Sequence, residues 1–313
     1  MTKTILVIKL GALGDMFLAM DAFHALRRHH AGDRIVLLTR APFAKLAARM
    51  PWFDEVWTDP APKLWQVGKW LALRSRLRAA GFERVYDMQC NDRTAFYFRL
   101  LGPRRPEWSG TAKGCSHRCA DFQKGGAHVT ELHLRMIEDA GVPRAGAANL
   151  GWLDGALDEF RLPARFVLIV PGCAPHRLYK RWPAEHYAEL ARRLGHRGLG
   201  VFAVGTAVDR QMIDAIRALT PEVVDLSGRT DFGQLAALAR RAEGVVGNDT
   251  GPVHITAAAG APTLVLMSGV TDPVRMVPRG PSVGWLRREN MADLGVDEVE
   301  AALRLRLPPL VSP

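Results

Sequence analysis

Short apolar runs alternate with segments of helical periodicity along nearly the whole of this 313-residue chain. Such alternation is typical of α/β domains, in which helices cover both faces of a parallel sheet. Strands are predicted at residues 4–8, 34–39, 55–58, 84–88, 166–170, 200–204, 223–226, 244–246 and 263–267. Helices are predicted at residues 15–30, 42–50, 63–80, 94–101, 130–140, 183–196, 207–219, 232–241, 252–259 and 297–307.

A stretch rich in Gly, Ala and Pro, residues 141–163, interrupts the alternation near the middle of the chain. The length of the chain is about twice that of an ordinary domain. We therefore expect two doubly wound domains, 1–150 and 151–313, with a linker region at 141–165. Parallel sheets bind ligands beyond the carboxyl ends of their strands, so the expected site lies in a cleft between the two domains.

The charge of the chain is unevenly distributed. The formal net charge is +10, of which residues 1–155 carry +8 and residues 156–313 carry +2. Such an excess suits an anionic partner, either nucleic acid, a membrane surface or an acidic substrate. An Arg-rich genome is the alternative explanation, since Lys accounts for only 8 of the 42 basic residues. The content of 48% hydrophobic and 24% charged residues excludes a disordered or collagen-like chain.

The cysteines suggest reduced thiols in a cytoplasmic protein; they are Cys90, Cys115, Cys119 and Cys173. Cys115 and Cys119 lie near His117 and His128, which admits a metal site, but the lack of a second pair favours a loop with two free thiols. The amino terminus runs directly into a predicted strand without the architecture of a signal peptide, and no uncharged apolar run is long enough to span a bilayer. We expect a soluble or peripheral protein.

The first predicted strand ends in the loop KLGALGD, residues 9–15, and a helix follows at once. Its glycines permit a tight turn, but the loop has neither the spacing of a phosphate P-loop nor the dinucleotide fingerprint. Asp15 stands at the start of the helix, where it either caps the helix or acts as a general base. The residues alone favour the cap.

A basic loop, residues 171–183, follows the first strand of the second half. Lys180 and Arg181 stand beside a helix start, where they form either a phosphate clamp or a solvated basic surface. Asp209 follows the next strand, at a position from which an acidic residue reaches ribose hydroxyls. Its alternative role is a first-turn carboxylate that favours the helix dipole.

The string GNDTGPVH, residues 247–254, again joins a strand to a helix. Asp249 or Thr250 can cap this helix, and free amides at its start can bind a diphosphate. His254 either faces the same spot or is a hydrogen-bonded histidine of the core. Glycine-bearing loops after strands in both halves make a binding site more plausible than any one loop does.

The predicted helix 63–80 mixes aromatic, aliphatic and basic residues, namely Trp65, Trp70, Leu71, Lys69, Arg74 and Arg76. This mixture fits an amphipathic helix at a membrane interface. It fits equally a helix that packs on the core and exposes a basic outer face, which is the commoner case.

These strings resemble the motifs of the bacterial lipopolysaccharide heptosyltransferase family (glycosyltransferase family nine). The resemblance rests on ILVIK at 5–9 with Gly14 and Asp15, KRWP at 180–183, DTG at 249–251 with His254, AAAG at 257–260 and SGVTDP at 268–273. The motifs occur in the family's order and cover nearly the whole chain.

The resemblance implies a GT-B fold, with two Rossmann-like domains facing across a cleft. It implies inverting transfer of a heptose from ADP-heptose to the lipopolysaccharide inner core (Kdo–lipid A or a core heptose), without a metal or other cofactor. Asp15 then is the general base, in place of a pure cap. Lys180 stabilises the leaving diphosphate, and the donor site comprises Lys180, Asp209, Asp249, Thr250, Gly251 and His254.

The resemblance assigns the acceptor, an anionic glycolipid, to the first domain, where the match is loose. The candidate acceptor residues are Gly14, Arg93, Arg104, Arg105, Lys113 and Arg118. We expect peripheral contact with the cytoplasmic face of the inner membrane and no nucleic acid. The alternatives are another nucleotide-sugar or glycan acceptor on the same fold, or a non-catalytic nucleic-acid-binding protein; a nicotinamide dehydrogenase lacks its glycine fingerprint.

Overall fold

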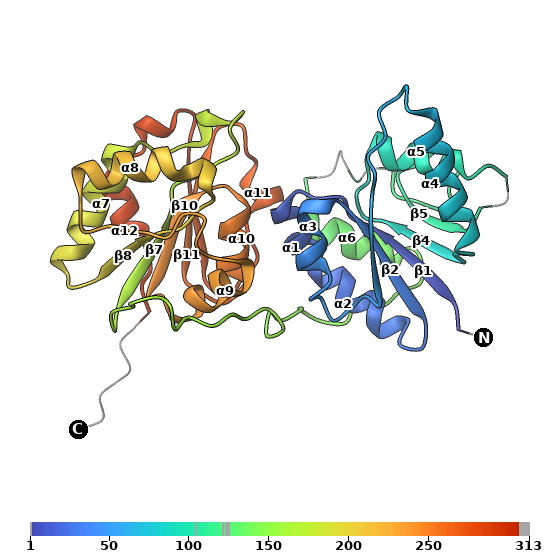
Figure 1. Cartoon of the computed structure of the whole chain (residues 1–313), viewed down its shortest axis with the longest axis horizontal. Helices are drawn as coiled ribbons and strands as arrows, with labels where there is room; N and C mark the ends of the chain where they lie inside the picture. Colours follow the sequence, from blue (N-terminus) through green and yellow to red (C-terminus); the bar gives the residue numbers. More distant parts are fainter. Residues whose placement is uncertain (1, 104, 121, 123–125, 307–313) are drawn as a thin grey trace. The chain divides into compact units, whose positions relative to one another are not determined.

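The computed structural model of the chain describes residues 2–103, 105–120, 122 and 126–306. The chain forms two compact units, Met1–Ala148 (unit 1) and Asn149–Pro313 (unit 2). In Figure 1 unit 1 runs from blue to green and unit 2 from green to red. Each unit contains a six-stranded sheet in which every pair of neighbours is parallel. The predicted α/β class, with two Rossmann-like domains, is confirmed.

The sheet of unit 1 has the order β3-β2-β1-β4-β5-β6. Its strands are β1 (Thr4–Ile8), β2 (Arg34–Thr39), β3 (Glu55–Thr58), β4 (Arg84–Asp87), β5 (Glu107–Gly110) and β6 (His117–Arg118). Because β1 pairs with both β2 and β4, the winding direction changes between β1 and β4. The loops after these two strands therefore flank the point at which such sheets bind ligands.

The helices of unit 1 are α1 (Leu13–Leu18), α2 (Met20–His29), α3 (Ala41–Ala47), α4 (Val67–Ala79), α5 (Asp92–Leu100) and α6 (Val129–Glu138). Figure 1 shows α1, α2 and α6 on one face of the sheet and α4 and α5 on the other. The single helix predicted at 15–30 is two helices that meet at Ala19. Beside this break the hydroxyl of Thr130 donates to the carbonyl oxygen of Leu18 at 2.8 Å.

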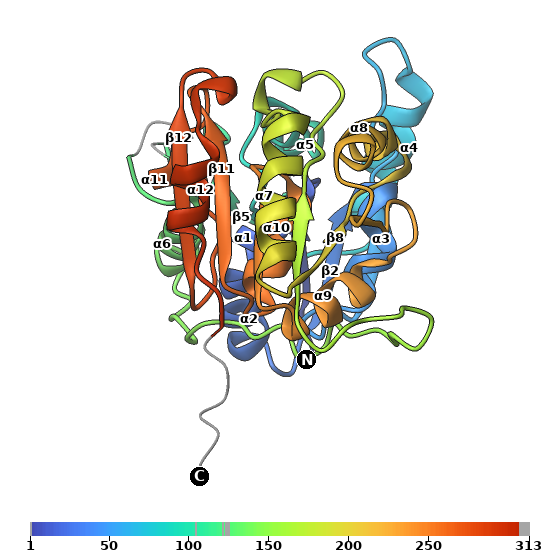
Figure 2. The same cartoon turned by 90° about the vertical axis from the view of Figure 1, so that its left-hand side faces the viewer.

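The sheet of unit 2 has the order β12-β11-β10-β7-β8-β9, so its winding changes direction between β7 and β10. Its strands are β7 (Phe166–Val170), β8 (Gly200–Ala203), β9 (Val224–Asp225), β10 (Gly244–Asn248), β11 (Thr263–Ser268) and β12 (Val283–Arg288). Its helices are α7 (Ala184–His196), α8 (Arg210–Leu219), α9 (Phe232–Arg241), α10 (Gly251–Ala258), α11 (Pro273–Met276) and α12 (Val296–Ala302), with 3-10 turns η1 (Leu178–Lys180), η2 (Ala207–Asp209) and η3 (Met291–Asp293). Figure 2 shows α7 and α12 in front of this sheet.

Three strands were not predicted, namely β5, β6 and β12. The reason is their sequences: β5 is EWSG, β6 is HR and β12 is VGWLRR. The strand β6 has two residues and ends one sheet, and β12 ends the other with Arg287 and Arg288 in its sequence. None of the three therefore contains the continuous apolar run by which buried parallel strands are recognised.

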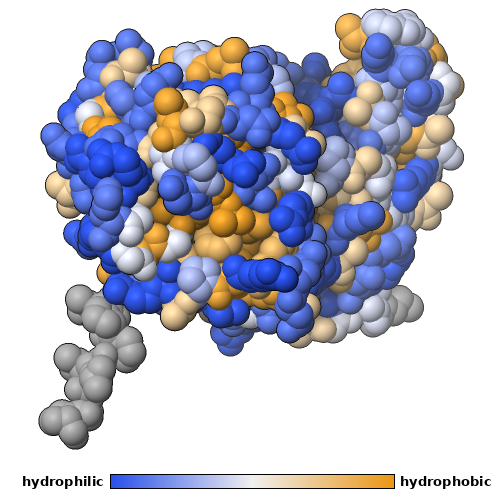
Figure 3. Space-filling model, turned by 60° about the vertical axis from the view of Figure 1, so that its left-hand side comes forward, coloured by the Kyte–Doolittle hydropathy of each residue, from blue (hydrophilic) through white to orange (hydrophobic). Residues whose placement is uncertain are grey.

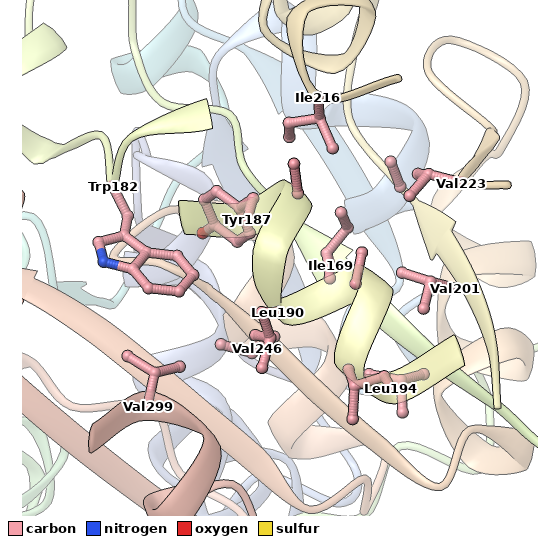
Figure 4. Close-up of a cluster of buried hydrophobic side chains, with 14 of the residues drawn as sticks. Ile169, Trp182, Tyr187, Leu190, Leu194, Val201, Ile216, Val223, Val246 and Val299 are labelled. Atoms are coloured by element: carbon pink, nitrogen blue, oxygen red, sulfur yellow. The ribbon is translucent and has the colours of Figure 1, made fainter. Parts of the chain in front are cut away.

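The core on one face of the unit 2 sheet also positions a loop (Figure 4). Trp182 and Tyr187 are fully buried and pack edge to face, with ring centroids 4.8 Å apart. The indole Nε1 of Trp182 donates to the carbonyl oxygen of Leu294 at 2.8 Å. This packing fixes the end of the loop 171–183, which carries Lys180.

Within the described residues, every helix is too short or too polar to cross a bilayer.

Candidate active site

Asp15 lies in the first turn of α1, just beyond the carboxyl end of β1, and its side chain is half-buried. Its Oδ2 accepts a hydrogen bond from the backbone N–H of Ala12 at 2.9 Å. Among the described residues, no donor contacts the other oxygen, Oδ1. Capping by one oxygen therefore leaves the second available to a ligand, so the two roles considered for Asp15 do not exclude each other. Gly14 precedes it in the same turn.

The first residue of this loop, Lys9, belongs to the ILVIK string but had been given no role of its own. Lys9 is only 4% exposed, and its Nζ donates to the carbonyl oxygen of Met88 at 3.0 Å. The same oxygen lies 3.1 Å from Nε2 of His133, which is fully buried. Burial lowers the pKa of Lys9, against the opposing charges of Asp15 and Asp87. Burial also holds the pKa of His133 well below its usual value.

The loop after β4 is tied to the loop after β1. The backbone N–H of Leu10 donates to Oε1 of Gln89 at 2.8 Å. Asp87 Oδ1 accepts from the amides of Gln89 and Cys90 at 3.2 and 3.1 Å. Asp87 is fully buried, and burial raises the pKa of its carboxyl to about 6. The position of Lys9 and Asp87, each at the end of an apolar run, is the sequence signal that identifies them.

The predicted acceptor residues do not form a single patch. Lys113 and Arg118 line a cavity of about 310 Å³ together with Arg99 and Asn91. The three basic side chains outnumber the one acidic side chain of the lining, Asp92, which favours an anionic group. Arg93 lines a different groove, where it donates to the carbonyl oxygen of Pro62 at 3.3 Å.

The structure places Arg105 apart from the other candidate acceptor residues that it describes. Arg105 lines a pocket with Lys3, Arg84 and Glu107, at the amino ends of three strands. Asp15 follows the carboxyl end of β1, on the opposite edge of the same sheet. Arg104, the other member of that pair, lies outside the described residues.

In unit 2 the side-chain amide of Asn248, which had been given no role, connects two loops at the point where the winding direction of the sheet changes. Asn248, at the end of β10, is fully buried. Its Oδ1 accepts from the N–H of Trp182 and from the hydroxyl of Tyr187, both at 3.1 Å. Its Nδ2 donates to the carbonyl oxygen of Pro171 at 2.7 Å. Asn248 therefore fixes the loop after β7 against the end of β10.

The predicted donor residues Lys180 and Asp249 meet in this frame. Lys180 Nζ lies 2.5 Å from Asp249 Oδ2, and both side chains are mostly buried. The hydroxyl of Thr271 donates to the same carboxylate oxygen at 2.9 Å. Lys180 is thus held in place rather than belonging to a solvated basic loop. Thr271, which belongs to the SGVTDP string, had not been given a role.

Asp209 lies in η2, and it is almost fully buried. Its Oδ2 accepts from the N–H and the hydroxyl of Thr206 at 2.8 and 2.9 Å. A Cβ on Gly172 would stand 2.2 Å from Oδ1 of Asp209, and a Cβ on Gly205 would stand 3.0 Å from its Cβ. The two glycines after β7 and β8 therefore leave the space that the Asp209 side chain fills. Oδ2 therefore completes a capping box with Thr206 at the start of η2, whereas the predicted roles were a ribose ligand and a first-turn carboxylate that favours the helix dipole.

The start of α10 offers fewer amides than its sequence position suggests. Pro252 has no N–H, and the N–H of Val253 donates to the carbonyl oxygen of Thr250 at 3.2 Å. In the described part of the chain, no protein acceptor contacts the amides of Thr250 and Gly251. These two N–H groups remain for an anion. His254 is buried on α10, at 4% exposure.

The cysteine side chains bear on a reactive thiolate and on a metal site. Burial raises the pKa of the Cys173 thiol, which argues against a reactive thiolate at this loop. Across the residues that the structure describes, no three His, Cys, Asp or Glu side chains gather as metal ligands, and Cys115 and Cys119 form no such group.

Comparison with known proteins extends over both units. A model of glycosyltransferase family 9 (heptosyltransferase) matches residues 145–302. Lipopolysaccharide heptosyltransferase 2 of Escherichia coli K12 is 27% identical over 292 residues, which cover 86% of this chain and 83% of the relative.

Two solved structures show the same fold. The structure of E. coli ADP-heptose lps heptosyltransferase II has a TM-score of 0.76 and 23% identity, and the match covers 96% of this chain and 97% of that one. The structure of E. coli heptosyltransferase WaaC with ADP-2-deoxy-2-fluoro heptose has a TM-score of 0.74 and 19% identity, covering 95% and 98%. The expected GT-B fold class is confirmed.

Proposed function

The chain belongs to glycosyltransferase family 9, the heptosyltransferases, and we propose that this glycosyltransferase moves a heptose from ADP-heptose to the inner core of lipopolysaccharide with inversion. The proposed acceptor is Kdo–lipid A or a core heptose. The donor proposal is supported by the related WaaC, whose solved structure contains an ADP-sugar analogue. The acceptor proposal is supported by the relatives that act on lipopolysaccharide.

The observation that carries the donor half is the cluster after β7 and β10. The Lys180 amine and the amides of Thr250 and Gly251 offer positive charge and hydrogen-bond donors to a diphosphate. Asp209 and His254 complete the proposed donor site. Such preorganised groups stabilise the charge that develops on the leaving ADP, and the proposed reaction uses no metal ion.

The proposed chemistry transfers one proton and exchanges one bond. The acceptor hydroxyl gives its proton to Oδ1 of Asp15 while its oxygen attacks the anomeric carbon. The bond from that carbon to the diphosphate oxygen breaks on the opposite side, and its electron pair leaves with ADP. Attack opposite to the leaving group inverts the anomeric configuration. Asp15 then returns the proton to water.

In the same proposal unit 1 binds the acceptor and unit 2 binds the donor. Lys113 and Arg118, together with Arg99, are suited to a phosphate or carboxylate of an anionic glycolipid, and Gly14 lies beside the proposed base. The enzyme would work at the cytoplasmic face of the inner membrane, in peripheral contact with it.

The test is incubation of the whole protein with ADP-heptose and a series of truncated core acceptors, with products identified by mass spectrometry. We expect one added heptose, an inverted anomeric centre by NMR, and activity that survives a chelator. A panel of other nucleotide-sugars is the control for the donor. Transfer from one of those alone would replace ADP-heptose, and loss of activity in chelator would overturn the metal-free reaction. Absence of transfer with salt-sensitive RNA or DNA binding would favour the non-catalytic alternative.

A further inference from the structure

Unit 1 has an exposed apolar surface, here called the α4 face, that takes no part in its core. Its members come from the segment before α4, from α4 and from α5, and they are Leu64, Trp65, Val67, Leu71 and Phe96. Leu64 is 88% exposed and Trp65 is 74% exposed. A groove of about 700 Å³ runs beside them, with Trp70 and Leu100 in its lining. In Figure 3 this part of unit 1, at the upper right, shows orange apolar atoms among blue ones.

The α4 face is built on a fixed support. The indole Nε1 of Trp70 donates to the carbonyl oxygen of Lys63 at 3.1 Å, and Arg93 donates to the carbonyl oxygen of Pro62. Trp70 also packs edge to face against Phe96, with ring centroids 4.9 Å apart. The backbone before α4 is thus fixed by hydrogen bonds from Trp70 and Arg93. The helix α4 packs on the core of unit 1 through other residues, Leu73 and Leu77.

The charge around the α4 face is mostly positive. Residues 63–80 contain no acidic residue and five basic ones, namely Lys63, Lys69, Arg74, Arg76 and Arg78. The amine of Lys63 lies 5.1 Å from the ring centroid of Trp65, so one of these charges stands directly on the apolar surface. Asp92 is the acidic side chain in the groove lining.

We propose that the α4 face docks onto a lipid bilayer that contains anionic lipids. The exposed Trp and Leu side chains suit the boundary between head groups and acyl chains, and the surrounding basic residues suit lipid phosphates. A protein partner fits less well, because lysines are depleted at the centre of protein interfaces. At a bilayer, by contrast, Lys63 buries its methylene stem and keeps its amine among the head groups.

The proposal deepens the proposed function, of which peripheral membrane contact is a part, but it is measured without transfer. The whole protein is floated with phosphatidylethanolamine vesicles that contain or lack phosphatidylglycerol. We expect binding to the anionic vesicles alone, weakened by salt. The double variant Leu64→Ser/Trp65→Ser should lose binding by about ten-fold or more. Lys63→Gln/Lys69→Gln should lose it by about thirty-fold.

Controls of the same residue types or the same charge come from exposed residues elsewhere. Leu219→Ser/Trp285→Ser removes exposed apolar side chains of unit 2, and Lys45→Gln/Arg241→Gln removes two exposed charges; both should bind like the parent. Unchanged vesicle binding by Leu64→Ser/Trp65→Ser would overturn the proposal. The proposal would also be overturned if the parent sedimented as a dimer and this variant as a monomer. The α4 face would then bind a second copy of the chain. Transfer to a water-soluble acceptor, measured in parallel, shows whether the proposed function itself holds.

Discussion

Lys180 and Asp249 form a buried ion pair, with 2.5 Å between Nζ and Oδ2. Removing one member leaves the other charge desolvated, which is costlier than removing both. A diphosphate that binds the amine of Lys180 competes for it with the carboxylate of Asp249. The pair therefore links the stability of unit 2 to the strength of its proposed donor site, and the two effects can be separated by substitution.

Lys180→Met should lower the free energy of unfolding by about 3 kcal/mol, because Asp249 is left buried without its counter-ion. The double variant Lys180→Met/Asp249→Asn should recover most of that loss. Neither variant should recover affinity for ADP, since both lack the amine. Denaturant unfolding and calorimetric titration of ADP make the comparison, with Lys45→Met as a control at an exposed lysine. Parental ADP affinity in Lys180→Met would remove Lys180 from the donor site.

Asp15→Asn should keep the fold and abolish most of the transfer. The asparagine oxygen can still accept the Ala12 amide, but it cannot take a proton, and loss of a general base costs about 100- to 10,000-fold in rate. Asp21→Asn is the matched control, because Asp21 likewise accepts a hydrogen bond from a backbone amide, that of Ala148 at 2.9 Å. The measurement is single-turnover transfer alongside thermal unfolding. Near-parental turnover would show that Asp15 serves only as a cap.

The central strands and most helices could be predicted from the sequence because parallel strands buried on both faces are continuous apolar runs. The strands β5, β6 and β12 could not, because their sequences are short or polar, and the missing β5 also affected the prediction of the site. Arg105 stands two residues before β5, and a residue just before a parallel strand lies at the amino edge of the sheet. Without β5 in the prediction, its sequence position gave no sign that it lies away from Asp15.

For the site, the sequence identified motifs but not the contacts between their side chains. Lys180 and Asp249 were both named for the donor site, but their pairing across 69 residues depends on the order β10-β7, which a sequence does not state. Asn248 belongs to the same motif as Asp249 but was given no role, because its amide acts by holding two loops together and not by contacting a ligand. Such residues become visible only when their hydrogen-bond partners are known.

Gly172→Ala should destabilise unit 2 by about 1 to 3 kcal/mol, since the new Cβ meets the carboxylate of Asp209 and a packed site tolerates no added carbon. Gly195→Ala, in α7, is the control: nothing stands near its Cβ, and alanine should raise stability by about 0.5 to 1 kcal/mol. Unfolding midpoints of the two variants should move in opposite directions. A neutral Gly172→Ala would mean that Asp209 shifts freely.

Asp87 should make the stability of unit 1 depend on pH in the direction opposite to an ordinary ion-paired carboxylate. Burial raises its pKa to about 6 from an unfolded value near 3.8, so the folded chain holds this proton more tightly. The contribution is fully present below the unfolded pKa and is lost as the pH rises through about 6. Between about pH 4 and pH 7 the loss amounts to about 2 kcal/mol.

Asp87→Asn isolates this effect, because asparagine can still accept from the amides of Gln89 and Cys90 but has no proton to lose. The stability of the parent relative to Asp87→Asn should therefore fall as the pH rises over that range, measured by urea unfolding at several pH values. Glu131→Gln is the control of opposite sign, since ion pairs with Arg144 and Arg135 lower the pKa of Glu131 to about 2 and its contribution is lost toward acid pH. A parent-to-variant difference that stays constant from pH 4 to pH 7 would mean that Asp87 titrates like an exposed carboxylate and that the loop after β4 admits water.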